Sequence, residues 1–399
     1  MSVKQHDLGE AVKLLRLPFI LFCLIAFATA AAEPPPHVKS QDDLAAHLAA
    51  LEQSPLRYFS EPGRKHFLSR LMHFEDGFAY PSSLLFELSP AQQAQVHALF
   101  GRDEDARSLA GKTGVNLAET ASPEIVEAYW RFVRELDDFV NATENHRESR
   151  FRAAVITLLR EHLGALLDRD TGGTDIDTIY AIKAMDTAFF YTGDASLVRR
   201  MEELVDALVR RFEDPSIAAL RERTYQHLLV AREMNRAEAF AKRHAVTPVE
   251  WKVSGNDDIA GRPAVLKLRN DGLLTAEAVD FEALTGVVVS VSPYCSFSKA
   301  AMRYIETDRE LLELLEDRVL WLADQRLTAE LPSILEWNDE SELDMHLVWK
   351  DSAWPEEIDF GATPFFYFVR NGEIVETLKG WENDGNAELL KKKIKAMLE

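Results

Sequence analysis

The side chain with the clearest chemical potential is the thiol of Cys295, which has the hydroxyl group of Ser298 three residues further on. A thiolate attacks disulfides, and it forms more readily where its surroundings lower the thiol pKa. Cys295 comes between a β-branched apolar run and a helical pattern, so we expect it where a buried strand passes into a helix. Unpaired N–H groups and the helix dipole stabilise a thiolate at such a position.

The same position has a second consequence for Cys295. Side chains at the carboxyl ends of strands border the crevice in which open α/β sheets bind ligands. The alternative is a small buried hydrophobic residue, which is what most lone cysteines are. Because the thiol is predicted at a strand end, we favour a reactive cysteine.

Strand and helix patterns alternate on both sides of this thiol. The run 286–291 is apolar and β-branched, which is typical of a strand covered on both faces. Asn371-Gly372 is the strongest type of signal for a two-residue hairpin. The other predicted elements are strands over 264–268, from Leu273 after an Asn270-Asp271-Gly272 turn, and over 318–323, 363–369 and 373–378, with helices over 295–306, 330–337 and 387–398. This order predicts an α/β sandwich with a mixed sheet.

The helix predicted after the thiol has one apolar stripe, formed by Phe297, Ala301, Tyr304 and Ile305. Residues at these spacings lie on one face of an α-helix. The helix is therefore predicted to be amphipathic, with these four residues on its apolar face.

The first half of the chain has a helical period from about Gln41 to Val246. Ser89-Pro90 and Ser122-Pro123-Glu124 are typical helix starts, with serine as the N-cap and proline in the first turn. The pattern predicts an all-α domain of about two hundred residues. The predicted organisation is a signal peptide over 1–32, an all-α domain over 33–246, a linker or edge hairpin over 247–260 and an α/β domain over 261–399.

Composition limits the classes of protein that fit this sequence. The chain has 399 residues, with 66 acidic and 45 basic side chains and a net charge of −21. This acidic surplus argues against binding to nucleic acid or to anionic lipid, because both require a basic face. Two cysteines in a chain of this length exclude a disulfide scaffold.

The first residues are typical of an export signal. Basic side chains, the last of them Arg16, precede an apolar run over 17–28, and Ala28-Thr29-Ala30 supplies small residues for cleavage. The alternative is an uncleaved membrane anchor, but the apolar run is short against the roughly 20 residues of a spanning helix. We favour cleavage of a Sec-type signal and a periplasmic or secreted protein. Loss of Cys23 with the signal leaves Cys295 as the only cysteine.

The C-terminal third, from about Gly261 to Met397, resembles a thioredoxin-fold domain of the TlpA/AhpC-like, periplasmic thiol–disulfide type. The order and spacing of several short segments carry the resemblance. These segments are Asn270-Asp271-Gly272, the strand 284–291, the turn 293–298, and 362–368 followed by Asn371-Gly372. The resemblance does not extend to the helical domain.

The resemblance assigns roles to individual residues. In the family two cysteines form C-x-x-C, of which the first attacks a substrate disulfide and the second resolves the mixed disulfide. Cys295 matches the attacking cysteine, and Ser298 occupies the resolving position. Tyr294 takes the place of the usual tryptophan. Thr363-Pro364 matches the cis-proline segment, which presents backbone groups to an extended substrate.

The sequence also departs from the family in its buried acids. A carboxylate is expected six residues before the first cysteine, where Val289 stands, or six residues after it, where Ala301 stands. Neither side chain ionises. The second thiol and the groups that activate it are missing together, which indicates that ordinary dithiol chemistry is lost.

Three functional hypotheses follow. The first is an exported monothiol thioredoxin-like protein, a thiol–disulfide oxidoreductase or isomerase if it is an enzyme, whose Cys295 forms mixed disulfides with client proteins or small thiols. In it, Ser298 supports the sulfur, and the helical domain supplies dimerisation or client selection. The second is a binding or scaffold protein with an inactive thiol. The third, a peroxidase, rests on a likeness of Ser292-x-x-Cys295 to peroxiredoxins, whose proline is replaced here by Val288.

No cofactor or metal is expected. The acidic stretch 168–177 is similar to a calcium-binding loop in its spacing of acidic residues. However, its fifth position is Gly172, and its twelfth is Ile179, where a bidentate glutamate is needed. We therefore interpret the stretch as the end of one helix and the cap of the next. The sequence has no glycine-rich loop of the kind that binds phosphate.

Overall fold

A computed structural model describes residues 37–75, 77–143, 146, 148–168, 175–210, 215–254, 259, 261–268, 273–382 and 386–399. The predicted signal peptide, the Asn270-Asp271-Gly272 turn and residues 169–174 of the acidic stretch lie outside these residues. Among the residues described, none of the helices combines the length and the apolar character needed to cross a bilayer.

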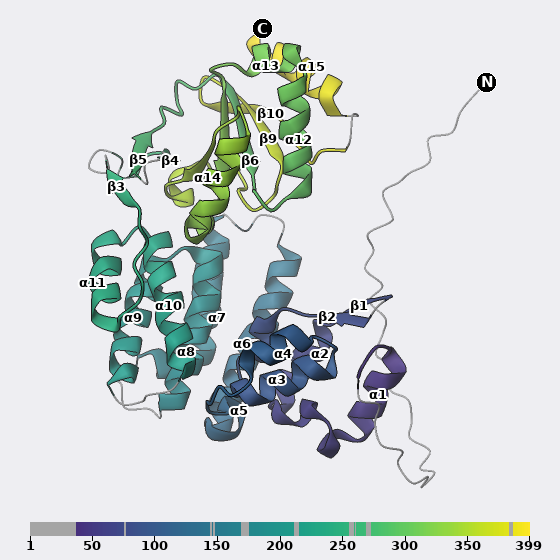
Figure 1. Ribbon diagram of the computed structural model, residues 1–399. Helices are drawn as coiled ribbons and strands as arrows, with labels where there is room; N and C mark the ends of the chain where they lie inside the picture. Colours follow the sequence, from purple (N-terminus) through teal and green to yellow (C-terminus); the bar gives the residue numbers. More distant parts are fainter. Residues whose placement is uncertain are drawn as a thin grey trace, which may run out of the picture.

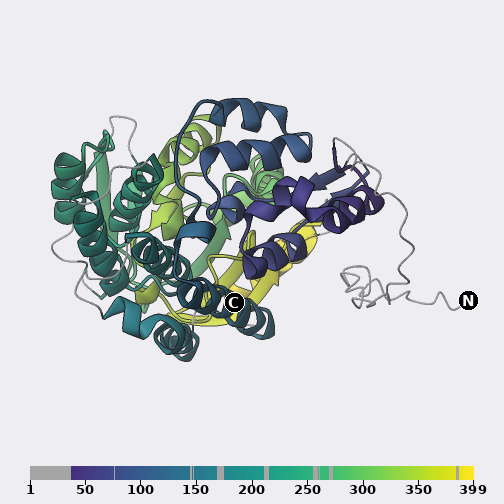
Figure 2. The same cartoon turned by 90° about the horizontal axis from the view of Figure 1, so that it is seen from below.

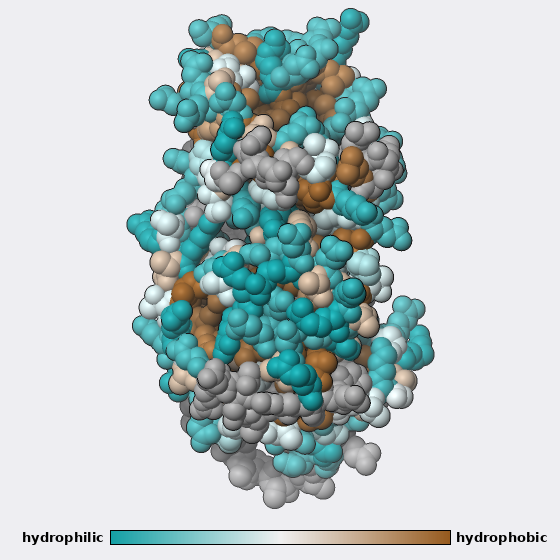
Figure 3. Space-filling view, turned by 90° about the vertical axis from the view of Figure 1, so that its left-hand side faces the viewer, coloured by the Kyte–Doolittle hydropathy of each residue, from teal (hydrophilic) through white to brown (hydrophobic). Residues whose placement is uncertain are grey.

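The chain forms a helical region, over residues 37–246, and a sheet region, over residues 247–399. Figure 1 shows the sheet region above the helical region, and Figure 2, seen from below, shows the helices in front of the sheet. Hydrophilic side chains cover most of the face seen in Figure 3, as the acidic surplus of the sequence leads one to expect.

The helical region begins with short elements around a small aromatic core. Serine N-caps start several of them: Ser40 and Ser89 each form a capping box, the second with Pro90 in the first turn. The elements are α1 (Gln41–Ala49), α2 (Glu61–Ser69), α3 (Pro90–Leu99), α4 (Asp103–Leu109) and α5 (Leu117–Thr120), with a two-stranded ribbon of β1 (Met72–Phe74) and β2 (Gly77–Ala79). The ribbon is a departure from the purely helical prediction.

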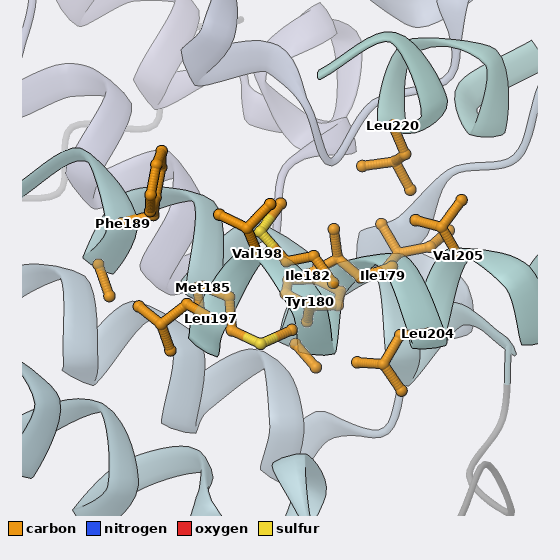
Figure 4. Packing of buried hydrophobic residues seen from close by; sticks show 14 of the residues in the cluster. Ile179, Tyr180, Ile182, Met185, Phe189, Leu197, Val198, Leu204, Val205 and Leu220 are labelled. Atoms are coloured by element: carbon orange, nitrogen blue, oxygen red, sulfur yellow. The ribbon is translucent and has the colours of Figure 1, made fainter. Parts of the chain in front are cut away.

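Six longer helices follow, and each packs against the next along the chain. They are α6 (Pro123–Ala142), α7 (Ser149–Leu167), α8 (Asp175–Thr192), α9 (Ala195–Val209), α10 (Pro215–Val230) and α11 (Met234–His244). Figure 4 shows Ile182 and Met185 of α8 among the side chains of α9, with Val198 close by. Periodic apolar residues therefore bury a continuous core, as the helical pattern predicted.

A buried carboxylate joins the small aromatic core to the long helices. Glu87, which is fully buried, accepts hydrogen bonds from Trp130 Nε1 at 2.6 Å and from the Tyr180 hydroxyl at 2.8 Å. The hydroxyl of Ser60 also donates to Glu87, at 2.9 Å to Oε2. Burial raises the pKa of Glu87, while these donors act to lower it. The four side chains form one polar network that only the folded chain brings together.

The sheet region contains one mixed sheet in the order β10-β9-β6-β7-β8-β4-β5-β3. Its strands are β3 (Lys252–Ser254), β4 (Ala264–Leu268), β5 (Leu273–Ala278), β6 (Gly286–Val291), β7 (Val319–Ala323), β8 (Met345–Val348), β9 (Phe365–Arg370) and β10 (Glu373–Lys379). β6 is parallel to β7 and antiparallel to β9. The predicted mixed sheet is confirmed.

The two faces of the sheet have different coverings. On one face, Val287, Val289 and Val291 pack with residues of the helices α12 (Ser296–Thr307), α13 (Arg309–Leu315), α14 (Leu331–Glu340) and α15 (Ala387–Leu398). On the other, Val288 packs with Trp354 and Phe360 from an irregular segment. Alternate side chains of β6 thus enter two cores, which explains why its whole length is apolar.

Most predicted elements of the sheet region match the observed ones within a few residues, and Asn371-Gly372 forms the expected turn with positive φ angles of 49° and 79°. Within the 247–260 segment, predicted as a linker or edge hairpin, β3 joins the edge of the sheet in parallel with β5. The strand β8 and the helix α13 were not predicted. Both are short, and β8 contributes only four residues.

One buried guanidinium joins the two regions. Arg232, just after α10 and with φ of 64°, donates from Nε to the carbonyl oxygen of Trp349 at 2.6 Å and from Nη2 to that of Val348 at 2.8 Å. Nη1 donates to the hydroxyl of Thr328 at 2.7 Å. Burial lowers the pKa of Arg232 to about 9, so the group stays charged at neutral pH. These hydrogen bonds attach the helical region to the end of β8.

We predict that Glu87→Ala lowers the free energy of unfolding by about 3 kcal/mol, because it leaves the buried donors of Trp130 and Tyr180 unpaired. Glu87→Gln should cost less, since it keeps an acceptor oxygen. Urea denaturation measures both changes. Glu161→Ala, at an exposed position of α7, is the control. An unchanged urea midpoint for Glu87→Ala would contradict the structural role of the network.

Arg232→Met should lower the free energy of unfolding by about 3 kcal/mol and separate the two regions, because three buried acceptors lose their donor. Urea denaturation and limited proteolysis between the regions measure the effect. The control is Arg236→Met in α11, which removes one of two arginines paired with Glu202. Because Arg243 keeps its ion pair with Glu202, this variant should cost less than about 1 kcal/mol. Equal stability of the two variants would refute this role for Arg232.

Candidate thiol site

The thiol lies where the sequence placed it, at the junction of a strand and a helix. β6 ends at Val291, and after a tight turn, in which the N–H of Cys295 donates to the carbonyl of Ser292 at 3.1 Å, α12 begins at Ser296. Cys295 is the N-cap residue of α12 and is half-buried. The positive end of the helix dipole therefore lies next to the sulfur.

The register of the sheet brings a second segment to the sulfur. Ser290, near the end of β6, pairs with Phe365, the first residue of β9. The residues just before β9 therefore lie beside the residues just after β6. The Cys295 thiol donates to the carbonyl oxygen of Thr363 at 3.2 Å, and the Thr363–Pro364 peptide bond is cis.

The surroundings of Cys295 favour its thiolate. Partial burial raises the pKa of Cys295 and is the largest single influence. Hydrogen bonds from the side-chain hydroxyl of Thr363, from the N–H and hydroxyl groups of Ser298 and from the Phe297 N–H together outweigh it. The net pKa of Cys295 is lowered. The groups that lower it most are neutral hydrogen-bond donors, so the effect depends on local geometry rather than on a nearby cation.

Ser298 lies beneath the sulfur and has no access to solvent. Its hydroxyl oxygen accepts a hydrogen bond from the backbone N–H of Ser292 at 3.4 Å, while the hydroxyl group also contacts the thiol. The residue thus connects the turn before the helix with the first turn of the helix. Its geometry suits support of the thiolate.

Two aromatic side chains flank the thiol on the outside. Tyr294 and Phe297 are each 59% exposed. The Tyr294 hydroxyl donates to Glu330 Oε2 at 2.8 Å and lies 2.8 Å from the Ser333 hydroxyl of α14. An exposed apolar surface of this kind beside a half-buried thiol can contact a substrate chain.

The apolar stripe predicted for α12 divides between core and solvent. Ala301 and Ile305 are fully buried, whereas Phe297, in the first turn of the helix, is 59% exposed. Helical periodicity identifies a face but not where the covering surface ends.

The other predicted site residues are Thr363 and Pro364, and the structure brings both to the thiol. Val289 and Ala301 stand where the resemblance implies a buried acid. Both are buried in the apolar core that α12 forms with the sheet. In the described part of the chain, no group of three or more His, Cys, Asp or Glu side chains is arranged to hold a metal ion.

A cavity of about 330 Å³ borders the segment that precedes Thr363 and was not foreseen from the sequence. It lies between α7 and α8 of the helical region and loops of the sheet region, with Arg152, Phe190, Arg326, Asp359 and Ala362 among its lining residues. Ala362 directly precedes Thr363, whose carbonyl contacts the sulfur. No local pattern could have revealed this cavity, because its walls come from segments far apart in the chain.

Comparison with known proteins finds no matching family model, no similar curated protein and no similar solved structure. The geometry around Cys295 therefore carries the functional interpretation. Its central features are the lowered thiol pKa, the cis Thr363–Pro364 bond and the exposed aromatic side chains.

We predict that Cys295 of the folded protein ionises at lower pH than the same thiol in the unfolded chain. Ser298→Ala should raise the pKa of Cys295, because it removes a donor to the thiolate. The rate of alkylation by iodoacetamide across pH reports both values. Ser296→Ala, which changes the neighbouring exposed serine, should leave the profile unchanged. A folded thiol that titrates like the unfolded one would overturn the site.

Proposed function

We propose that this protein is an exported monothiol protein with a thioredoxin-like sheet region, which forms mixed disulfides with other thiols through Cys295. The order of elements supports the proposal. β6, α12 and the parallel strand β7 are followed by the antiparallel hairpin β9–β10 and by α15, the succession that the resemblance implies. Export remains a proposal that rests on the sequence of residues 1–32.

The observation that carries the proposal is the contact between the Cys295 sulfur and the Thr363 carbonyl, 3.2 Å apart, at a cis Thr363–Pro364 bond. A half-buried thiol of lowered pKa at this point has nucleophilic character and access to a partner. The segment around Pro364 lies where the backbone of a bound polypeptide could pair with it, since it precedes the first residue of β9.

The proposed reaction is thiol–disulfide exchange. The Cys295 thiolate attacks one sulfur of a partner disulfide, a new S–S bond forms, and the partner's other sulfur leaves with the electron pair and takes a proton from water. Ser298 does not complete a second exchange, because a hydroxyl group is a poor nucleophile toward sulfur and this one is buried. The mixed disulfide therefore persists until an external thiolate attacks it.

Persistence of the adduct distinguishes this mechanism from that of a dithiol protein. In the latter, a second thiol three residues after the first releases the partner within the same molecule. Here the release step depends on the concentration of free thiol outside. A long-lived adduct suits capture or protection of a client thiol. The helical region is then available for client selection or for dimerisation.

We predict that the tagged protein, expressed with its signal peptide, forms covalent adducts with exported proteins that disappear on reduction. Cys295→Ser should abolish these adducts, because the nucleophile is missing. Ser298→Cys should lower their yield, by about ten-fold, because a neighbouring thiol resolves them. Non-reducing electrophoresis followed by mass spectrometry of the captured proteins measures the yield.

Ser296→Cys is the matched control for Ser298→Cys, since it also adds one thiol but at an exposed site outside the C-x-x-C spacing. It should not lower the yield to the same extent. If Cys295→Ser binds every partner as well as the unmodified protein does, the thiol is inactive and the protein is a scaffold. If no partner is captured and the thiol is unreactive, the proposed function fails.

A further inference from the structure

The cavity between the two regions has features of a binding site. The proposed thiol–disulfide exchange does not involve it. Its volume of about 330 Å³ is at the lower end of the range for small-molecule pockets. The loop 359–362 forms part of its wall and continues into Thr363, whose carbonyl contacts the Cys295 sulfur. The wall of the cavity is thus continuous along the chain with the segment that touches the thiol, although Cys295 itself does not line the cavity.

Charges of both signs line this cavity. The cationic side chains are Arg152, from α7, and Arg326, and carboxylates come from Asp324, Asp351 and Asp359. Arg326 is paired with Asp324 through Nε at 2.9 Å and lies over the ring of Phe190, 4.7 Å from its centroid. The lining thus contains two ion pairs, Arg326 with Asp324 and Arg152 with Asp351.

Arg152 and Asp359 have capacity for a ligand. Among described residues, the guanidinium of Arg152 makes one hydrogen bond, a long one of 3.4 Å to Asp351, and so most of its five donors are available. Asp359 Oδ1 accepts from the backbone N–H of Gly361 at 2.8 Å, and a carboxylate has further acceptor sites. Phe190, whose ring lies under Arg326, adds an aromatic side chain to the lining and is 46% exposed.

We propose that this cavity binds the ammonium and carboxylate groups of a small zwitterionic thiol or disulfide, of the size of an amino acid or short peptide. Arg152 holds its carboxylate, Asp359 holds its ammonium group, and its sulfur extends past Ala362 toward Cys295. This inference rests on the proposed function and gives its low-molecular-weight substrate class. The exchange is balanced as above: the Cys295 thiolate takes one half of the disulfide, and the other half leaves as a thiolate.

The overall charge of the protein allows local recognition to be distinguished from general electrostatic attraction. With a net charge of −21, the chain as a whole attracts cations and repels anions. Without a local site, a dicationic disulfide should therefore react faster with Cys295 than a neutral or a dianionic one. A preference for a zwitterion over the dication requires local recognition of both charged groups.

The experiment compares three symmetric disulfides on the full-length mature protein: cystine, which is zwitterionic, cystamine, which is dicationic, and dithiodipropionate, which is dianionic. The rate of mixed-disulfide formation at Cys295 is measured by mass spectrometry. Each rate is divided by that of a peptide of residues 292–298, which removes differences in leaving-group reactivity. We expect the normalised rate for cystine to exceed both others by about five-fold or more.

Variants locate the preference within the cavity. Arg152→Gln and Asp359→Asn should each lower the normalised rate for cystine about five-fold, because each deletes one charge of the site. Most of the preference for cystine is then lost. Arg150→Gln is the matched control. Arg150 belongs to the same helix, but its side chain is 84% exposed and does not line the cavity, so this variant should keep the full preference.

The outcomes separate the two proposals. Equal normalised rates for the three disulfides, or cavity variants that behave like Arg150→Gln, overturn the zwitterion site while a reactive Cys295 leaves the proposed function standing. If Cys295 reacts with none of the disulfides, the proposed function fails. Calorimetric titration of Cys295→Ser with cystine then tests the cavity separately from the thiol. Binding that is lost when Arg152→Gln is added to this variant supports the site, and absence of binding overturns it.

Discussion

The structure depends on one buried guanidinium that has backbone carbonyls, rather than a carboxylate, as its main partners. Arg232 follows the helix α10 and donates to the carbonyl oxygens of Val348 and Trp349 at the end of β8. Because the group stays charged while buried, each of these hydrogen bonds is costly to lose. This contact joins the two regions together with the ion pair of Arg152 with Asp351 and the hydrogen bond from the Ser149 N–H to Glu356, and residues of both regions wall the cavity between them.

The thiol site depends on a second constraint, the pairing of β6 with β9. That register places Thr363 and Pro364 beside Cys295, while the start of α12 aims backbone donors at the sulfur. Neutral hydrogen bonds, not a neighbouring cation, then lower the thiol pKa. The buried hydroxyl of Ser298 takes the place of a second thiol, and on this geometry we base the proposal of a long-lived mixed disulfide.

Much of the sheet region was predictable, because its signals are local. The β-branched run of β6, the Asn371-Gly372 turn and the apolar period of α15 each specify an element through residues close in sequence. β8 was missed because its four residues acquire a strand conformation from their neighbours β7 and β4 rather than from their own pattern. Phe297 belongs to the apolar stripe of α12 but is exposed, because periodicity does not report where along a helix the covering surface ends.

The amino-acid sequence alone determined that a single thiol follows a buried strand, begins a helix and lacks a resolving cysteine. These are properties of neighbouring residues, and backbone preferences and side-chain chemistry suffice to express them. Only the tertiary structure decided that Thr363 touches the sulfur, that Arg232 joins the regions, and that Arg152 and Asp359 face one cavity. Such contacts join residues up to 207 positions apart, and their distances are set by packing of whole elements, which no short stretch of sequence encodes.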